Sequence, residues 1–153
     1  MNIDKIKVDL KFAEMILNDK GSNSYEIDGA AYHVQQAVEK SLKYYLSNVY
    51  GDKEDTKAFK THSLGILYAR CLEHGMKKDD FPEGLTDLLE DISSWEAGAR
   101  YGEETVSERE DVEKAHDMAK EMFTKVEELE HKENLTVIES KEKEERSWTP
   151  KGR

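Results

Sequence analysis

The sequence lacks most of the features that mark secreted, membrane-spanning or disulfide-stabilised proteins. Its 153 residues include a single cysteine, Cys71, so no intrachain disulfide can form and the cysteine usage gives no sign of secretion. No apolar run approaches the roughly 20 residues that a membrane-spanning helix needs. The N-terminal segment MNIDKIKVDLKF carries charges throughout, where a signal peptide would have an apolar centre. We therefore expect a soluble, cytoplasmic protein that does not bind membranes.

Positive charge is also scarce relative to negative charge. Lys and Arg total 23, whereas Asp and Glu total 34, which gives a net charge of −11. Diffuse binding to DNA or to anionic membranes depends on many Lys and Arg contacts, so an acidic surface of this size opposes it. The composition leaves room only for a small, local basic pocket.

Proline is rare, so the helix ends have to be marked by glycine and by capping residues. Between these marks, apolar residues recur every three or four positions, the spacing of one helical face, and no run alternates as a strand would. The expected helices run from Ile3 to Leu17, from Ser24 to Val49, from Thr61 to His74, from Pro82 to Trp95 and from Ser107 to about Glu130. The sequence thus predicts an all-α, up-and-down bundle of four to five helices.

Two segments depart from this helical pattern. Gly98 and Gly102 flank the pair Arg100-Tyr101, which predicts a loop before the last helix. The chain ends in KEKEERSWTPKGR, which is too polar to pack against a core. We therefore expect a helical domain over residues 1–131, followed by a charged, disordered C-terminal tail over residues 132–153.

Motifs that carry known chemistry are largely absent. The sequence has no glycine-rich phosphate loop, no His-Glu-x-x-His and no paired Cys-x-x-Cys. Glu113 and His116 have the Glu-x-x-His spacing of paired metal ligands, but a di-iron bundle needs two such motifs and two further inward glutamates. Cys71 lies on an apolar helical face, which favours a buried core residue over a nucleophile. We expect neither a metal nor another cofactor.

Arg109 and His116 form the one constellation that favours catalysis. Seven residues apart on a helix, they point the same way, about 10 Å apart along the axis. A guanidinium can hold a phosphate in a forked contact and an imidazole can move a proton near neutral pH. The pair could therefore cleave a phosphodiester without metal. The alternative is two solvated side chains at the edge of the core.

Three segments resemble a known family. Residues 31–43, AYHVQQAVEKSLK, resemble the signature helix of the HEPN family (higher eukaryotes and prokaryotes nucleotide-binding domain). Residues 60–64, KTHSL, resemble the Thr-His-x-Leu that opens the next helix of that family. Residues 99–101, ARY, resemble the Arg-Tyr that precedes its last long helix. The matches come in the expected order and cover about residues 5–130.

The resemblance implies a helical bundle that is usually a homodimer, and it implies one of two functions. One kind of HEPN domain is a metal-independent ribonuclease with an Arg-x4-6-His motif, often a toxin or defence protein. The other kind lacks a working motif and is linked to nucleotide binding or to a small nucleotidyltransferase partner. Arg109 and His116 satisfy the motif at its upper limit of spacing, but Glu110 and the acidic stretch SEREDVEKAHD depart from it.

We consider a nucleotide- or phosphate-binding module the better interpretation. The three matched segments supply most of the cations in an otherwise acidic chain. Their side chains predict a groove beside the second helix, lined by Lys40, Lys43, His62, Arg100 and Tyr101. Such a homodimer would bind a nucleotide-like ligand or pair with a nucleotidyltransferase, as in a toxin–antitoxin system.

Two alternatives remain open at this point. The first is a metal-independent endoribonuclease of the toxin or defence type, which acts on RNA with Arg109 and His116. The second is a helical scaffold without a ligand.

Overall fold

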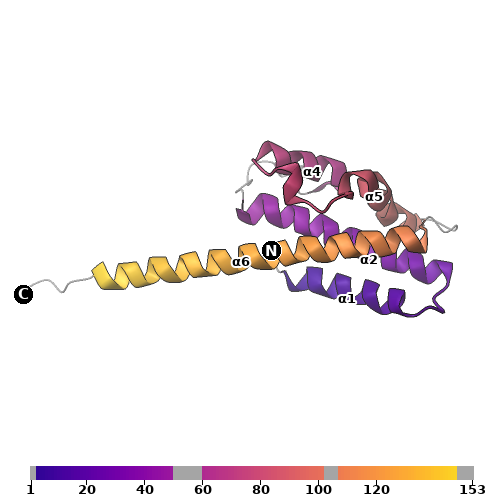
Figure 1. Ribbon diagram of the computed structural model, residues 1–153, viewed down its shortest axis with the longest axis horizontal. Coiled ribbons are helices and arrows are strands. Elements are labelled where there is room, and N and C mark those ends of the chain that lie inside the picture. The colour runs from indigo at the N-terminus through magenta and orange to yellow at the C-terminus, as the bar shows by residue number, and fades with distance from the viewer. Residues whose placement is uncertain (1–2, 50–59, 102–106, 148–153) are drawn as a thin grey trace, which may run out of the picture.

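The computed structural model describes residues 3–49, 60–101 and 107–147 (Figure 1). These residues form the helices α1 (Asp4–Asn18), α2 (Ser24–Tyr44), α4 (Leu64–Glu73), α5 (Leu85–Tyr101) and α6 (Arg109–Ser147), with a π-helical turn η1 (Tyr45–Val49) and a 3-10 turn η2 (Lys78–Asp80). No strand occurs among them, so the predicted all-α bundle is confirmed. None of these helices combines the length and the apolar character needed to cross a membrane.

Helix α2 lies at the centre of the bundle and contacts each of the other four helices. Helices α1 and α6 also pack against each other, as do α4 and α5, so that two helix pairs flank α2 (Figure 1). The long apolar face that the sequence shows over this segment is therefore the surface around which the domain is built. Ala30 and Ala37 are fully buried on it, and such small side chains allow the neighbouring helices to approach closely.

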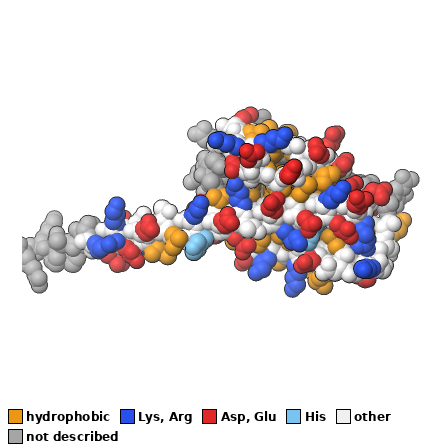
Figure 2. Space-filling model, in the orientation of Figure 1, with side chains coloured by type: hydrophobic (Ala, Val, Ile, Leu, Met, Phe, Trp, Pro, Cys, Tyr) orange, Lys and Arg blue, Asp and Glu red, His pale blue; other side chains and the backbone are white. Residues whose placement is uncertain are grey.

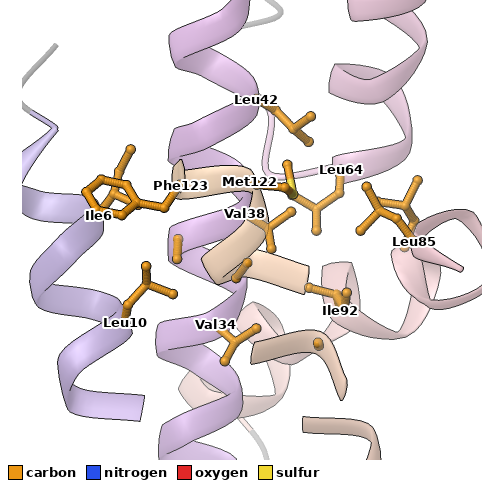
Figure 3. Close-up of a cluster of buried hydrophobic side chains, with 14 of the residues drawn as sticks. Ile6, Leu10, Val34, Val38, Leu42, Leu64, Leu85, Ile92, Met122 and Phe123 are labelled. Atoms are coloured by element: carbon orange, nitrogen blue, oxygen red, sulfur yellow. The ribbon is translucent and has the colours of Figure 1, made fainter. Parts of the chain in front are cut away.

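The core consists of hydrophobic side chains, aliphatic and aromatic, from all five helices. Val34, Val38 and Leu42 of α2 are fully buried at its middle (Figure 3). The labelled side chains around them come from the other helices: Ile6 and Leu10 from α1, Leu64 from α4, Leu85 and Ile92 from α5, and Met122 and Phe123 from α6. Burial of this apolar surface is the main term that stabilises the fold.

The start of α2 carries a complete capping box. The side chain of Asn23 accepts a hydrogen bond from the backbone N–H of Glu26, and the side chain of Glu26 accepts one from the backbone N–H of Asn23, both at 2.9 Å. These bonds satisfy backbone donors that the first helical turn would leave unpaired. They fix where the central helix begins.

The end of α2 is tied to α6 by two buried tyrosines. The Tyr44 hydroxyl donates to a carboxylate oxygen of Glu130, and the Tyr45 hydroxyl donates to the carbonyl of Met122, both at 2.9 Å. Burial, together with the hydrogen bond to Glu130, raises the pKa of Tyr44 above its ordinary value. Both phenols therefore act as structural donors.

Cys71 is a core residue, as the sequence predicts. Its side chain is fully buried on α4, with Sγ 3.9 Å from the carbonyl oxygen of Leu42. Burial raises the pKa of the thiol to about 12. The group therefore stays protonated at neutral pH, which excludes an activated nucleophile.

Helix α5 differs from the prediction at both ends. It begins at Leu85 rather than near Pro82, because Gly84 has φ +83°, a backbone conformation that a helix cannot include. The loop predicted between Gly98 and Gly102 is wrong up to Tyr101, since α5 continues to that residue. A glycine inside a helix costs only about 1 kcal/mol, which the buried side chains of Ile92 and Trp95 on the same helix outweigh.

The predicted tail is also helical over most of its length. Helix α6 continues through residues 132–147 and projects beyond the bundle (Figure 1), while residues 148–153 lie outside the described part. The prediction of disorder took polarity as its criterion, but Glu, Lys and Arg are strong helix formers. They here prolong a helix whose nucleus already exists, with an ion pair between Glu142 and Arg146 at 3.7 Å. A domain boundary at residue 131 stays a prediction.

Candidate functional site

Glu39 on α2 is the centre of a hydrogen-bonded cluster at the edge of the bundle. Its side chain is 6% exposed and accepts hydrogen bonds from Gln35 Nε2 and Lys43 Nζ, both at 3.0 Å, and from His62 Nδ1 at 2.9 Å. The residues 35, 39 and 43 meet because they lie one helical turn apart. Gln36 donates in turn to the side-chain oxygen of Gln35 at 2.7 Å, which fixes the orientation of that amide.

The cluster keeps Glu39 ionised. Burial alone would raise the pKa of this carboxyl, but the hydrogen bonds from His62, Lys43 and Gln35 outweigh burial and hold the pKa below its ordinary value. An ionised carboxylate can only accept, so His62 must carry its proton on Nδ1. Lys43 has three N–H donors and uses one on Glu39, which leaves two for other acceptors.

The segment before α4 places His62 against α2. Thr61 accepts a hydrogen bond from the backbone N–H of Ser63 at 3.0 Å, and Ser63 caps the helix by accepting from Ile66. Ser93 of α5 donates to the carbonyl of His62 and accepts from the backbone N–H of Leu64, both at 3.2 Å. The His62 side chain nevertheless stays 51% exposed, so an imidazole oriented by Glu39 faces the solvent.

Lys40 does not join this cluster, although the sequence analysis predicted that it lines the same groove. Its ammonium group instead forms a salt bridge with Asp9 of α1, and His33 Nδ1 contacts the same carboxylate at 2.9 Å. The Asp9 side chain is 10% exposed, so this second cluster lies at the seam between α1 and α2. The structure thus assigns Lys40 and Lys43 to different partners.

Arg100 and Tyr101 form the last turn of α5. Their backbone is helical rather than the predicted loop, and their side chains lie outside the described residues.

Arg109 holds the end of α1. Its guanidinium donates to the carbonyl oxygens of Leu17 and Asp19, both at 3.1 Å, and lies 3.5 Å from a carboxylate oxygen of Glu113. A cation at this place satisfies helix-terminal carbonyls and interacts favourably with the helix dipole. Two of the five N–H donors of the guanidinium are thus engaged by the backbone, which ties this side chain to the end of α1.

His116 is buried between α6 and α1. Its side chain is close to fully buried, and Nε2 donates to the carbonyl of Leu10 at 3.2 Å. A hollow of about 250 Å³ lies beside it, and the charged side chains that line the hollow are Glu14, Glu113, Asp117 and Lys120. Three carboxylates against one ammonium repel a phosphate, so folding does not turn the acidic stretch away from His116.

Comparison with protein families decides the assignment. A family model described as HEPN domain matches residues 7–129, which is most of the chain. The chain belongs to the HEPN domain family. No curated protein and no solved structure matches it. Membership supports a nucleotide-binding or ribonuclease-type module in general.

The HEPN match includes the clusters around Glu39 and Asp9 and ends before the projecting part of α6. Within the described residues, no three His, Cys, Asp or Glu side chains are grouped so that they could hold a metal ion. What the Glu39 cluster can do chemically is bind: it presents an ammonium and an imidazole that a buried carboxylate orients. An acceptor such as a phosphate oxygen is the natural complement of the Lys43 ammonium, which keeps two N–H donors beyond the one used on Glu39.

The sequence analysis gave no role to Asp9, which the structure shows as the acceptor for both His33 and Lys40. A signal was present, because Asp9 lies three residues after Ile6 and four before Ala13, at the margin of the apolar face of α1. A carboxylate at such a position is half withdrawn from water and needs a cation. Its partners on α2 were not identifiable without the fold.

Proposed function

We propose that this HEPN domain binds a nucleotide or another phosphate-bearing ligand at the α2–α4 edge, next to Lys43 and His62. The observation that carries the proposal is the shared carboxylate of Glu39, which holds both side chains within 3.0 Å. Because Glu39 already orients them, little side-chain entropy is lost when a phosphate binds. The half-exposed ring of His62 gives a ligand access to the cluster.

We further propose that the domain acts as a homodimer that pairs with a small nucleotidyltransferase. This part of the proposal rests on Arg100-Tyr101, whose sequence resembles the branch of the family that is not known for cleavage. The hydrogen bonds of Arg109 and His116 also favour a binding function over a ribonuclease function. Both side chains donate to backbone carbonyls of α1 and of its C-terminal end, so both have a structural role.

Equilibrium titration of the full chain with ATP, GTP and a short RNA tests the binding site. We expect saturable binding of at least one of them, weakened about tenfold or more by Lys43→Gln, since a hydrogen bond to a charged group contributes about 1.5–3 kcal/mol. The matched control is Lys40→Gln, one turn earlier on α2, whose ammonium contacts Asp9. Binding that responds equally to both substitutions, or no saturable binding by the folded protein, would contradict the proposal.

A further inference from the structure

Helix α6 continues beyond the bundle as a free-standing segment, residues 131–147, which we call the α6 extension (Figure 1). It carries exposed aliphatic side chains: Leu135 is 45% exposed, Val137 52% and Ile138 51%. Figure 2 shows hydrophobic side chains on the extension, apart from the bundle. Aliphatic side chains exposed on a helix that projects beyond the bundle mark a candidate interaction surface.

The helical repeat places two of the three aliphatic residues in one stripe. His131, Leu135, Ile138 and Glu142 are spaced by four, three and four residues, so they lie along one face, which we call the Leu135 stripe. Val137 is two residues, or about 200°, from Leu135 and therefore lies on a different face. The extension thus has a narrow apolar seam with an ionisable side chain at each end.

We propose that the Leu135 stripe pairs with the same stripe of a second copy of the chain, with the two extensions antiparallel. A twofold axis between residues 136 and 137 sets Leu135 opposite Ile138 of the second copy, and the symmetry repeats that contact. The two leucines and two isoleucines brought together in this way are large, branched side chains of the kind that fills a seam between two helices.

Charge complementarity selects this arrangement. In the same register His131 faces Glu142 of the second copy, and Lys132 flanks Glu139 of the second copy, each pair occurring twice by symmetry. A parallel, in-register pair would instead set Glu142 against Glu142 and His131 against His131, which is repulsive when these groups are charged. The alternating signs along the extension therefore favour a second copy in antiparallel orientation.

The seam is short, which predicts a reversible dimer. It runs from residue 131 to residue 142, about 18 Å of helix. The seam ends there because the next pair in this register, Glu128 and Glu145 of the second copy, would repel each other. Such a seam is smaller than a standard interface, which buries about 1,200–2,000 Å². It leaves the two bundles at opposite ends, since each extension points away from its own bundle (Figure 1).

Sedimentation equilibrium of the full chain over a concentration series tests the proposal. We expect the wild type to self-associate reversibly, and we expect the double variant Leu135→Glu/Ile138→Glu to associate at least severalfold more weakly. Val137→Glu is the matched control, equally exposed but off the stripe, and should associate like the wild type. A monomeric wild type, or a double variant that associates like the wild type, overturns the pairing of the stripes.

A charge swap tests orientation and register. Lys132→Glu alone sets two pairs of glutamates against each other, and Glu139→Lys alone sets two pairs of lysines against each other, so each should weaken the dimer severalfold. The double variant Lys132→Glu/Glu139→Lys restores opposite charges and should regain wild-type association. All five side chains changed in these tests are exposed, so circular dichroism should show an intact bundle. Additive loss in the double variant overturns the antiparallel register.

Discussion

A single carboxylate can determine where two side chains of a protein point, and Glu39 has this role here. It is buried, it is ionised, and it accepts from the two side chains that we assign to ligand binding, Lys43 and His62. The sequence predicted that Lys43 and His62 line one groove, but it assigned no role in that groove to Glu39, whose i,i+4 spacing from Lys43 is equally typical of a surface ion pair. The contact between His62 and Glu39 could not be predicted from the sequence, since it depends on how α4 packs on α2.

The lowered pKa of Glu39 predicts how stability depends on pH. The ordinary pKa is 4.5 and the folded value is lower, so the unfolded chain takes up this proton first as the pH falls. The contribution of Glu39 to stability is complete above its ordinary pKa and is lost as the pH falls through the folded value. Urea unfolding of wild type and Glu39→Gln should therefore show a difference in stability that is largest near neutral pH and shrinks as the pH falls below the ordinary pKa of 4.5.

The exposed Glu14→Gln is the control for this experiment and should follow the wild type at every pH. At neutral pH we expect Glu39→Gln to be less stable by about 1–3 kcal/mol, because its partners lose a charged acceptor. A difference that stays constant with pH would show that the Glu39 cluster is not charged in the folded protein.

The hydrogen bonds of Arg109 and His116 predict the outcome of a nuclease assay. We expect a mixed RNA pool, incubated in EDTA, to show the same background with wild type and with His116→Ala. Loss of the bond to the Leu10 carbonyl should instead lower the free energy of unfolding by about 1–3 kcal/mol. Cleavage that survives EDTA in the wild type and disappears in the variant would establish the ribonuclease function.

At the scale of elements, capping signals predict helix starts better than polarity predicts helix ends. Asn23 and Ser63 begin helices where the sequence has good capping residues, and Gly75 follows α4 with φ +107° as expected of a helix-ending glycine. Gly98 and the charged segment after Glu130 were expected to end helices and do not. A glycine or a run of charges lowers helix stability only slightly, so packing or an existing helix decides the outcome.

The capping box of α2 gives a prediction at this scale. Asn23→Ala removes the acceptor for the Glu26 N–H and should lower the free energy of unfolding by about 1 kcal/mol. Urea unfolding followed by circular dichroism measures this change, and Asn23→Ser, which can still cap, should recover most of the loss. An unchanged stability in Asn23→Ala would mean that packing alone determines the start of the helix.

At the scale of the whole molecule, the bundle has one core because α2 contacts every other helix. No helix pair can separate from the rest without exposing the apolar side chains of α2. This arrangement predicts one cooperative unfolding transition for the bundle. The apolar spacing along residues 24–49 was enough to predict this long helix, whereas the pairing of α1 with α6 and of α4 with α5 required the structure.

A pair of leucine substitutions tests whether the bundle unfolds in one cooperative transition. Leu42 is fully buried at the centre, and Leu42→Ala should lower the free energy of unfolding by about 2–5 kcal/mol and shift the whole transition. Leu72 is 38% exposed, so Leu72→Ala should have a clearly smaller effect. Tryptophan fluorescence and circular dichroism should report the same midpoint in each variant; separate midpoints would indicate two independently folding parts.

The burial of Cys71 has a practical consequence for physical studies of this chain. It is the sole cysteine, its side chain is fully enclosed, and the pKa of its thiol is about 12, so maleimides will not reach or react with it in the folded state. A cysteine introduced on the surface, for instance Ser140→Cys, would be the only reactive thiol. A spin label or fluorophore can therefore be attached at one chosen position, without first replacing the natural residue, to measure distances between copies of the protein.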